Sequence, residues 1–539
     1  MIDTPILIVG AGPVGLVLAK ELAHHGVRSM IVERNLDTTR WPKMDITNCR
    51  SMELLRRLGL DEGLRTVGVP SHFSFDVLFS TGLLGHEITR WSLPSVDAWR
   101  SRIRTQNDGT LPSEPYQRCS QEVFEAWMKK LCEANPLIEV RSGWRLDSLA
   151  QDSEQVTATV TDTVSGETHS IHARHLVGCD GATSAVRKTL GVSLDGRPVR
   201  RRGRLVHFKS RDLAALHAHG QFWHIFFAKS ATIISQDEVD TFTVQRYFPL
   251  DVDPTDFDSE EVVADALGRK ITIDRVLVTS VWQPQLLLAQ TYRIGRVFLA
   301  GDSAHQNIPT GGYGMNTGLG DAVSIGWKLA AVENGWGGPR LLDAYEAERR
   351  PVAARNIARS DRHADVHVEW RKHIKPDLVH ADSAAGAAHR TELAQLIQDL
   401  RGENEEHGIE LGYRYEASPV VIHESGTPPR WEHRNYVPTT WPGGRPPSVI
   451  LEDGTALFDR FGPEFTLLDF AGYGRADALL SAAKSRGVPL KHVVVRDQHA
   501  RELYERDLVL LRPDQHVAWR GDHVPDDPGA VIDTVRGIG

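Results

Sequence analysis

Cysteine is scarce in this sequence, and its scarcity limits the chemistry open to the chain. Only four cysteines occur among 539 residues. So few thiols in so long a chain do not form a disulfide framework, which favours a reducing compartment. They are Cys49, Cys119, Cys132 and Cys179, so everything beyond Cys179 lacks a CxxC exchange site.

Long apolar runs and an excess of positive charge are also missing. No stretch approaches the ~18 consecutive apolar residues of a membrane-spanning helix, and the amino terminus "MIDTPILIVG" lacks the basic start of a signal peptide. The formal net charge of -9 argues against a nucleic-acid or anionic-membrane partner. We therefore expect a soluble, cytoplasmic protein, and its length predicts two or three domains.

The amino terminus carries the pattern of a dinucleotide-binding unit. The apolar run from Ile6 to Val9 is typical of a buried parallel strand, and Gly10, Gly12 and Gly15 follow it as GxGxxG. Apolar residues at helical spacing and a second strand ending at Glu33 complete the unit. Glu33 lies near the spacing of about 20 residues expected for an acid that binds a ribose. The glycines let a diphosphate approach the free amides of the helix, but the pattern does not distinguish NAD from FAD.

Two later segments each show a short strand, an aspartate corner and a helix. "HLVGCDGATSAVRKTLG" places Asp180 at such a corner and Arg187 on the helix. "GRVFLAGDSAHQNIPTGGYGMN" places Asp302 after the strand, then a loop with one proline and three glycines. Glycine at this density weakens a packed element, so we expect a ligand to lie against the loop backbone. Either segment alone is also consistent with an aspartate that caps a helix.

In this order the three segments resemble the flavoprotein aromatic hydroxylases, the single-component monooxygenases typified by para-hydroxybenzoate hydroxylase and phenol hydroxylase. The likeness touches most of residues 1 to 360, including "YQRCSQEVFEAWM" and "LLDAYEAERRPVA". It implies an α/β fold in which a Rossmann-like FAD-binding domain is interleaved with a β-sheet substrate domain, followed by a thioredoxin-like carboxy-terminal domain. The implied boundaries are 1–75, 116–190 and 291–400 for the FAD-binding domain, 76–115 and 191–290 for the sheet domain, and 401–539 for the third domain.

The resemblance also implies which residues contact the cofactors. Asp302 takes the position of an aspartate that hydrogen-bonds the ribityl chain of FAD, and Arg50 that of an arginine that reaches its phosphates. Arg187 is the candidate for the nicotinamide pyrophosphate. The helix near Met315 would direct its amides at the anionic reduced ring. The implied set is Gly10, Gly12, Pro13, Val14, Gly15, Glu33, Arg34, Lys43, Arg50, Arg118, Gln121, Asp180, Gly181, Arg187, Gly301, Asp302, Pro309, Gly311, Gly312, Gly314, Met315 and Asn316.

The implied reaction is the hydroxylation of a phenolic or polyketide-like aromatic substrate. FAD is reduced by NADH or NADPH and then captures O2 as a flavin hydroperoxide. No second GxGxxG unit follows the first, which fits a nicotinamide cofactor that binds transiently. A Baeyer–Villiger or substituent-expelling monooxygenase on the same scaffold stays open, and a non-catalytic FAD-binding protein is a more distant alternative. The WxWxIP motif of flavin halogenases is absent.

This chemistry needs a base for the phenol proton and a site that excludes water. In "PKMDITNCRSMELL", Asp45 takes the position of an active-site aspartate of phenol hydroxylases. Neighbouring apolar side chains would raise its pKa, whereas Lys43 and Arg50 would lower it. The alternative is an aspartate that caps the helix beginning near Ser51.

Residues 191–290 contain segments rich in aromatic and β-branched residues, which predict an antiparallel sheet. In the family this sheet forms one wall of the substrate pocket, and strand alternation lets about half of its side chains face inward. The candidates for that wall are Trp223, His224, Phe226, Arg246 and Tyr247. The candidate catalytic residues are Asp45, His224, Tyr247 and Pro309.

The rest of the chain offers less chemistry. His363 and His367 have the spacing of metal ligands on a helix, but no third ligand is evident, so we predict a solvated helix face and no metal site. Beyond Pro442, a strand from Phe465 to Phe470 and a helix from about 475 to 484 resemble the thioredoxin-like domain of phenol hydroxylases. The resemblance assigns that domain a structural role or a part in a dimer contact.

Overall fold

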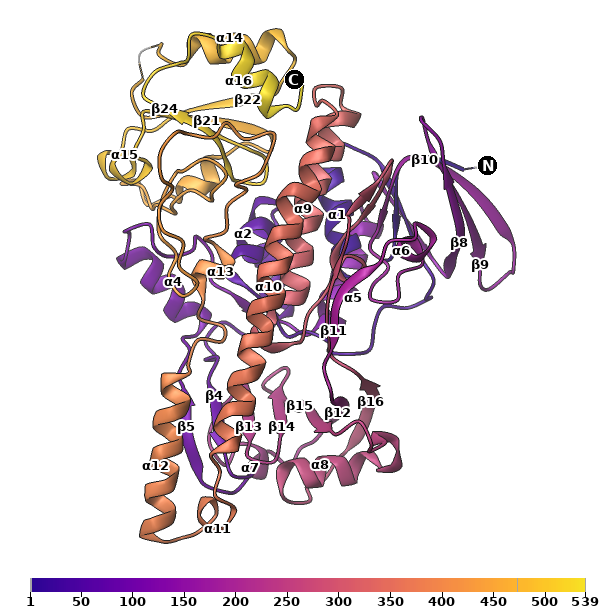
Figure 1. The fold of residues 1–539 in the computed structure, drawn as a ribbon, viewed down its shortest axis with the longest axis vertical. Coiled ribbons are helices and arrows are strands. Elements are labelled where there is room, and N and C mark those ends of the chain that lie inside the picture. The colour runs from indigo at the N-terminus through magenta and orange to yellow at the C-terminus, as the bar shows by residue number, and fades with distance from the viewer. Residues whose placement is uncertain (1, 473, 539) are drawn as a thin grey trace.

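The computed structural model describes residues 2–472 and 474–538. The molecule has three regions (Figure 1). The carboxy-terminal region lies at the upper left, and the middle region, which holds a large sheet and the amino terminus, lies at the upper right and centre, above a second sheet at the bottom. The long helix α10 (Arg340–Lys372) runs beside the middle region and down to the lower sheet.

The middle region is built on an eight-stranded sheet whose central neighbours are parallel. The pairs β1–β2, β1–β10, β10–β19 and β2–β7 all run in the same direction. Their carboxyl ends share one edge, where open α/β sheets bind their ligands. The strand order is β18 (Arg293–Ile294), β19 (Val297–Leu299), β10 (Thr168–Gly178), β1 (Ile2–Val9), β2 (Ser29–Glu33) and β7 (Ile138–Ser142), and β8 (Trp144–Gln151) and β9 (Val156–Asp162) extend it from β10.

Helices from three parts of the chain pack against this sheet. Leu16, Phe124 and Leu319 come from three different helices, and all are buried in the same core as Ile8 of β1. The predicted strand–helix–strand unit at the amino terminus is therefore present. The helices of this region are α1 (Pro13–His24), α2 (Cys49–Arg57), α3 (Asp61–Val67), α5 (Gln121–Glu133), α6 (Ala185–Thr189) and α9 (Tyr313–Glu333).

The lower region is a seven-stranded sheet assembled from two separate stretches of chain. Strands β4 (Val77–Ser80) and β5 (Glu87–Trp91) join strands from beyond residue 200, and β4 pairs in parallel with β13. One face of the sheet packs on helix α8, and the other faces the middle region. The strand order is β16 (Arg275–Trp282), β12 (Arg202–Lys209), β15 (Thr241–Phe248), β14 (Ala231–Ser235), β13 (His224–Phe227), β4 and β5; the helices are α4 (Val96–Thr105), α7 (Leu213–Leu216), η1 (Pro254–Asp256) and α8 (Ser259–Leu267).

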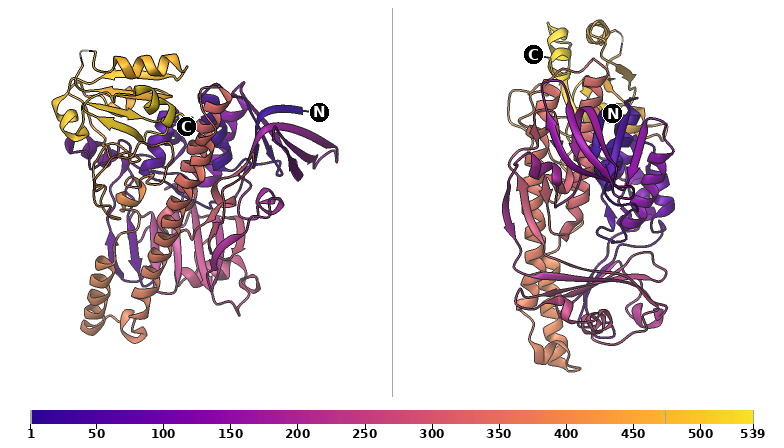
Figure 2. Two further views of the ribbon diagram at one scale, coloured as in Figure 1. Left: turned by 45° about the horizontal axis from the view of Figure 1, so that its top comes forward. Right: turned by 90° about the vertical axis from the view of Figure 1, so that its right-hand side faces the viewer.

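Short elements connect these two regions. Strand β20 (His305–Gln306), in the predicted glycine-rich segment, pairs with β17 (Gln285–Ala289) of the chain that returns from the lower sheet. Both views in Figure 2 show the lower sheet beneath the middle region. The remaining connecting elements are β3 (Ile46–Thr47), β6 (Gln117–Arg118), β11 (Leu194–Pro198), η2 (Gly301–Ser303), η3 (Thr310–Gly312), α11 (Pro376–Val379), α12 (Ala384–Asp399) and α13 (His407–Glu410).

The carboxy-terminal region has its own four-stranded sheet and core. The predicted strand and helix near residues 465 and 477 are present as β21 and α14, whereas α15 and α16 were not predicted. Apolar side chains of β21 and β23 are fully buried. The strand order is β22 (Leu490–Val494), β21 (Phe465–Asp469), β23 (Leu508–Leu511) and β24 (Val517–Gly521), with η4 (Leu457–Arg460), α14 (Asp477–Ser485), α15 (Gln498–Tyr504) and α16 (Pro528–Val535) around it.

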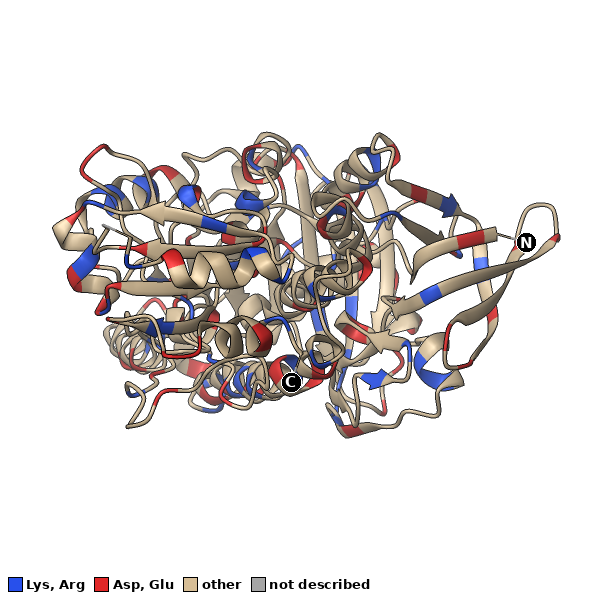
Figure 3. Cartoon of the chain, turned by 90° about the horizontal axis from the view of Figure 1, so that it is seen from above, with Lys and Arg blue, Asp and Glu red and all other residues tan. Residues whose placement is uncertain are grey.

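The charged residues do not gather on one face. Lysine and arginine alternate with aspartate and glutamate along the ribbon (Figure 3), in keeping with a net charge of -9 spread over 539 residues. Within residues 2–472 and 474–538, no helix combines the length and apolarity needed to cross a bilayer.

Candidate active site

One continuous cavity of about 1340 Å³ joins the middle region to the lower sheet. Its first end, the glycine-rich end, is lined by Gly10 to Val14, Glu33 and Asp180. Its second end, the sheet end, is lined by His224, Phe226 and Tyr247. The volume exceeds the ~300–1,000 Å³ usual for one small ligand, so the cavity has room for a dinucleotide and a second molecule.

The three glycines of the amino-terminal motif serve different purposes. Gly10 has φ +107°, and a Cβ there would lie 2.4 Å from the carbonyl oxygen of Cys179 at the end of β10. At Gly15 a Cβ would lie 2.1 Å from the carbonyl oxygen of Gly10, because α1 packs closely over the turn. Gly10 and Gly12 both line the cavity, and a Cβ at Gly12 would come no nearer than 4.0 Å to another heavy atom, Oε1 of Glu125. The free space beside Gly12 belongs to the cavity.

Glu33 ends β2 beside this turn, as the spacing predicted. Its Oε2 accepts a hydrogen bond from the amide of Ala11 at 2.9 Å, and its Oε1 accepts from the amide of Asn35. These bonds hold the carboxylate at the cavity wall. The exposed side chains of Arg34 and Lys43 line the same end, where they offer positive charge to a diphosphate.

Asp302 stands at the cavity wall in η2, just beyond β19. Its carboxylate makes no hydrogen bond or ion pair with any of the described residues, and the residue is exposed to the cavity. The surrounding protein desolvates the group and raises the pKa of Asp302, against the opposing influence of His305 and Lys43. A carboxylate held this way is suited to accept hydrogen bonds from hydroxyl groups of a ligand.

The loop after Asn307 and the start of α9 line the cavity between its two ends. The loop is tied down by Glu403, whose Oε1 accepts from the amide of Gly311 at 2.8 Å, and by Thr310, whose hydroxyl donates to the carbonyl of Ser360. Gly314 lies in the first turn of α9, where a Cβ would meet nothing within 4 Å. The helix therefore presents free amides to the cavity, an arrangement that favours a partly negative ligand.

These features fit FAD. At Gly12, Gly181 and Gly314 the backbone borders open cavity, so a diphosphate and a ring system have room to lie against it. Asp302 supplies an unpartnered acceptor, and the start of α9 supplies donors. The predicted cofactor residues that line the cavity are Gly10, Gly12, Pro13, Val14, Glu33, Arg34, Lys43, Gln121, Asp180, Gly181, Asp302, Pro309, Gly312, Gly314 and Met315.

Three predicted cofactor-binding arginines do not line the cavity. Arg50 is buried and donates to Glu53 and to the carbonyl of Asp514 at 2.7 Å, so it joins α2 to the carboxy-terminal region. Its side chain leaves α2 away from the cavity. In this arrangement the donors of Arg50 are engaged within the protein, and its contact with the FAD phosphates stays a prediction.

Arg118 and Arg187 are engaged in the same way. Arg118 pairs with Glu238 at 2.5 Å and donates to the carbonyl of Ser235, which joins β6 to the lower sheet. Arg187 donates to the carbonyl of Ser303 at 3.0 Å and to that of Ala182. Their donors are used within the protein because both side chains are buried where backbone carbonyls need partners, and their contacts with the cofactors stay predictions.

Four other predicted cofactor residues lie behind the cavity wall: Gly15, Gly301, Gly311 and Asn316. Asn316 is buried, and its side chain accepts from the amide of Asn48 at 2.9 Å and donates to the carbonyl of Ile46. It therefore binds the strand β3 to α9 rather than a ligand. Gly301 is needed because a Cβ there would lie 2.8 Å from Cγ2 of Val14.

Asp45 lines the cavity at the sheet end and belongs to a compact polar cluster. Its Oδ2 accepts from Nε1 of Trp223 at 2.9 Å and from Nε2 of His224 at 2.9 Å. Burial acts to raise the pKa of Asp45, but the contacts with His224, Trp223 and Arg118 outweigh it and hold the pKa below its ordinary value. Asp45 does not cap the next helix, since Asn48 accepts the hydrogen bond from the amide of Ser51.

The predicted alternation along β13 is present. His224 and Phe226 line the cavity, whereas Ile225 and Phe227 are buried on the opposite face of the sheet. Tyr247 of β15 also lines the cavity, and burial raises its pKa. Two of the suggested wall residues face elsewhere: Trp223 is buried behind Asp45, and Arg246 pairs with Asp265 at 2.9 Å.

Several cavity residues were not found from the sequence. His367 is 4% exposed and pairs through Nε2 with Glu403 at 2.6 Å, and His363 is buried against Tyr313. The prediction of a solvated helix face at these histidines is wrong. Burial on α10 recurs at Ser360, His363, Ala364, His367 and Trp370, and this helical spacing was the signal available. Other cavity residues that were missed include Arg40, Arg201, Gln245, Asn307, Arg371 and Glu403.

Comparisons with known proteins agree with this geometry. A family model described as FAD binding domain matches residues 3–360, and one described as aromatic-ring hydroxylase, C-terminal, matches residues 439–537. The FAD-dependent monooxygenase apdD of Emericella nidulans is 46% identical, over 96% of this chain and 88% of that protein.

Solved structures share the whole arrangement. The enzyme RebC, soaked with chromopyrrolic acid and holding 7-carboxy-K252c, matches with a TM-score of 0.89 and 36% identity, over 100% of both chains. The flavin-dependent monooxygenase PieE in complex with FAD and substrate matches with a TM-score of 0.89 and 29% identity, over 99% of both chains. The chain is an FAD-dependent monooxygenase and belongs to the flavoprotein aromatic-ring hydroxylases.

Proposed function

We propose that this enzyme uses NADH or NADPH and O2 to hydroxylate a phenolic or polyketide-like aromatic substrate. When bound, FAD accepts reducing equivalents from the nicotinamide and activates oxygen. One observation carries the proposal: a single cavity joins the glycine-rich end and Asp302 to the cluster of Asp45, Trp223 and His224. The aromatic-ring hydroxylase family of the carboxy-terminal region supports an aromatic substrate.

We assign different ligands to the two ends of the cavity. We assign FAD to the segments 1–75, 116–190 and 291–400, with Gly12, Glu33 and Asp302 as its principal contacts. We assign the substrate to the sheet end, formed by 76–115 and 191–290 together with α10. Phe226 and Tyr247 supply an aromatic wall there, and enclosure by the sheet and α10 keeps water away from the reacting groups.

The polar cluster at the sheet end is arranged to take a proton. Asp45 is ionised, so the hydrogen bond from His224 places that ring's proton on Nε2. The other ring nitrogen, Nδ1, has no hydrogen-bond partner among the described residues and is free to meet a substrate hydroxyl. We therefore assign His224 as the group that accepts the phenol proton and Asp45 as the group that orients it.

The test is the coupling of NAD(P)H consumption to product. With wild-type holoenzyme, a panel of phenols and naphthols should contain compounds that stimulate NAD(P)H oxidation and become hydroxylated. His224→Ala and Asp45→Asn should keep FAD and its reduction but release hydrogen peroxide in place of most product. Because Trp223 also binds Asp45, Trp223→Phe should give an intermediate loss of coupling.

The matched control is Arg246→Met, on the same sheet but outside the cavity, and its coupling should equal that of the wild type. Unchanged coupling in both His224→Ala and Asp45→Asn would remove this pair from the mechanism. A flavin that is reduced equally fast with and without every aromatic compound would count against hydroxylation itself. Mass spectrometry of the product separates ring hydroxylation from oxygen insertion beside a carbonyl.

A further inference from the structure

Arg201 is a cavity residue whose charge has no carboxylate partner among the described residues. It lies directly before β12, with its guanidinium 4.5 Å from the ring centroid of Tyr247. Its Nε is buried without a hydrogen-bond partner, and its guanidinium makes no ion pair among the described residues. The backbone is held in place, since Val199 donates to the carbonyl of Pro284 and Arg201 donates to that of Val199, both at 2.9 Å. A positioned arginine therefore ends in the cavity without an anion.

Arg371 of α10 is a second uncompensated cation at the same end. Its Nε and Nη2 donate to the carbonyl of Phe227 at 3.1 and 3.0 Å, and its Nη1 donates to that of His367 at 2.7 Å. These acceptors are neutral, so they orient the guanidinium without neutralising it. Burial, the nearby charge of Arg201 and that of Arg246 lower the pKa of Arg371 to about 9.

The acids of the same wall are already engaged. Oδ2 of Asp45 accepts from Trp223 and His224, and Glu403 accepts from the amide of Gly311 and pairs with His367. Neither forms an ion pair with an arginine of the cavity. Two enclosed guanidinium groups without an anion are unfavourable until a ligand supplies one.

We infer that Arg201 and Arg371 form a subsite for a carboxylate group carried by the aromatic substrate. Guanidinium groups recognise a carboxylate through paired hydrogen bonds, and the position beside Tyr247 places the anion at the edge of the aromatic wall. This inference rests on the proposed function, because it concerns the substrate at the sheet end. It adds that the substrate carries a carboxylate group, which the two arginines bind.

A pair of probes that differ only in charge tests the subsite. Wild-type holoenzyme is titrated with 2-naphthoate and with 2-naphthamide, and binding is followed by the change in flavin absorbance. The naphthoate should bind about 10- to 100-fold more tightly, as expected for one or two charge-assisted hydrogen bonds. Arg201→Met should remove most of this preference while leaving the affinity for the amide unchanged.

Arg371→Met should also reduce the preference for the naphthoate. Arg371→Lys keeps the charge and should retain part of the preference, and it replaces the methionine variant as the test if that variant folds poorly. Arg246→Met, whose arginine pairs with Asp265 outside the cavity, should retain it fully. Equal affinity of wild type for acid and amide, including no measurable binding of either, overturns the inference. Substrate-stimulated NAD(P)H oxidation by a neutral phenol, measured on the same preparations, shows separately whether the proposed function holds.

Discussion

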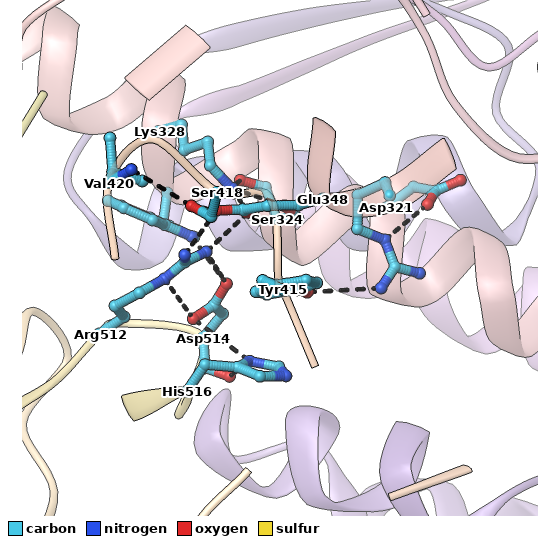
Figure 4. A network of polar contacts seen from close by, with 12 residues as sticks. Asp321, Ser324, Lys328, Glu348, Tyr415, Ser418, Val420, Arg512, Asp514 and His516 are labelled. Atoms are coloured by element: carbon cyan, nitrogen blue, oxygen red, sulfur yellow. Dashed lines mark hydrogen bonds and ion pairs between the residues drawn. The ribbon is translucent and has the colours of Figure 1, made fainter. Parts of the chain in front are cut away.

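Two groups of enclosed charges in this protein are built in opposite ways. In the first, Glu348 of α10 accepts hydrogen bonds from Nη1 and Nη2 of Arg512 at 2.6 and 2.8 Å (Figure 4). It also pairs with Lys328 of α9 at 2.7 Å. Asp514 pairs with Arg512 from the other side at 2.6 Å. The four side chains are at most 3% exposed. In the second group, Arg201 and Arg371 face the cavity with no carboxylate in contact.

The difference shows what each group is for. The first group, which we call the interdomain network, takes its members from α9, α10 and the carboxy-terminal region, so pairing its charges joins the regions. In the middle of α9, Asp321 pairs with His305 and Arg349 and accepts a hydrogen bond from the amide of Gly301. The carboxy-terminal region is thus fastened to the helix that begins at the cavity. The charged side chains that join regions of the protein form ion pairs, whereas Arg201 and Arg371, which we assign to a ligand, form none among the described residues.

Breaking the interdomain network should have the largest effect on stability. Arg512→Met leaves Glu348 and Asp514 buried with less positive charge, so we expect the free energy of unfolding to fall by about 3–5 kcal/mol. Urea denaturation measures the change. Lys372→Met is the control, because its partner Glu369 is 43% exposed, and it should shift stability by less than about 0.5 kcal/mol. An equal change in the free energy of unfolding of Arg512→Met and Lys372→Met would show that the buried network contributes no more to stability than an exposed ion pair.

The next largest effect concerns the cavity rather than the network. Asp302→Ala removes an acceptor that has no partner in the part of the chain that the structure describes, so the fold should persist while FAD binds about 10- to 100-fold more weakly. FAD occupancy after purification and the Kd for FAD measure this loss. Asp302→Asn retains an acceptor without the charge and should fall between wild type and Asp302→Ala. Full occupancy in Asp302→Ala would show that this carboxylate does not contact the cofactor.

Glu410 is a buried glutamate that forms no ion pair with a cation among the described residues, so the pH dependence of stability can distinguish it from the paired Glu348. Burial raises the pKa of Glu410 from its ordinary 4.5 to about 8, whereas Arg512 and Lys328 outweigh burial and lower the pKa of Glu348 to about 2. Between pH 4.5 and 8 folded Glu410 keeps a proton that the unfolded chain has lost. Stability should therefore fall with rising pH there, by at most about 1.4 kcal/mol per pH unit from this group.

Glu410→Gln should flatten that part of the profile, which urea denaturation at several pH values measures. The buffers contain EDTA, because possible ligand atoms of Cys49, His407 and Glu410 lie within 4.8 Å of one another, and a bound cation would keep the carboxylate ionised. A variant with the same slope as wild type between pH 5 and 8 would show that Glu410 titrates normally.

The smallest effect on stability is expected for a substitution at Arg201. Arg201→Met removes a half-buried guanidinium that makes no hydrogen bond to any of the described residues, so stability should change by less than about 0.5 kcal/mol or rise. The same substitution at Arg512 is expected to cost several times more. A loss of more than about 1 kcal/mol in Arg201→Met would mean that its contact with Tyr247 carries structural weight.

Local patterns were interpreted more reliably than the direction of side chains. The strand before Gly10, the acid at Glu33 and the helix after the glycine-rich loop were predicted because each depends on a few consecutive residues. Arg50, Arg118 and Arg187 were assigned to the cofactors from the family resemblance, yet each donates to protein groups in this arrangement. Which acceptors surround a buried arginine depends on segments more than 100 residues away.

The sequence by itself determined that the chain has a glycine-rich dinucleotide site and a second sheet with alternating faces, because glycine spacing and strand period are local properties. Only the tertiary structure decided which charges meet. Glu348 and Arg512 stand 164 residues apart and pair at 2.6 Å, while Arg201 and Arg371 approach the same cavity from a loop and a distant helix. Packing of whole regions sets those distances, and no short stretch of sequence records them.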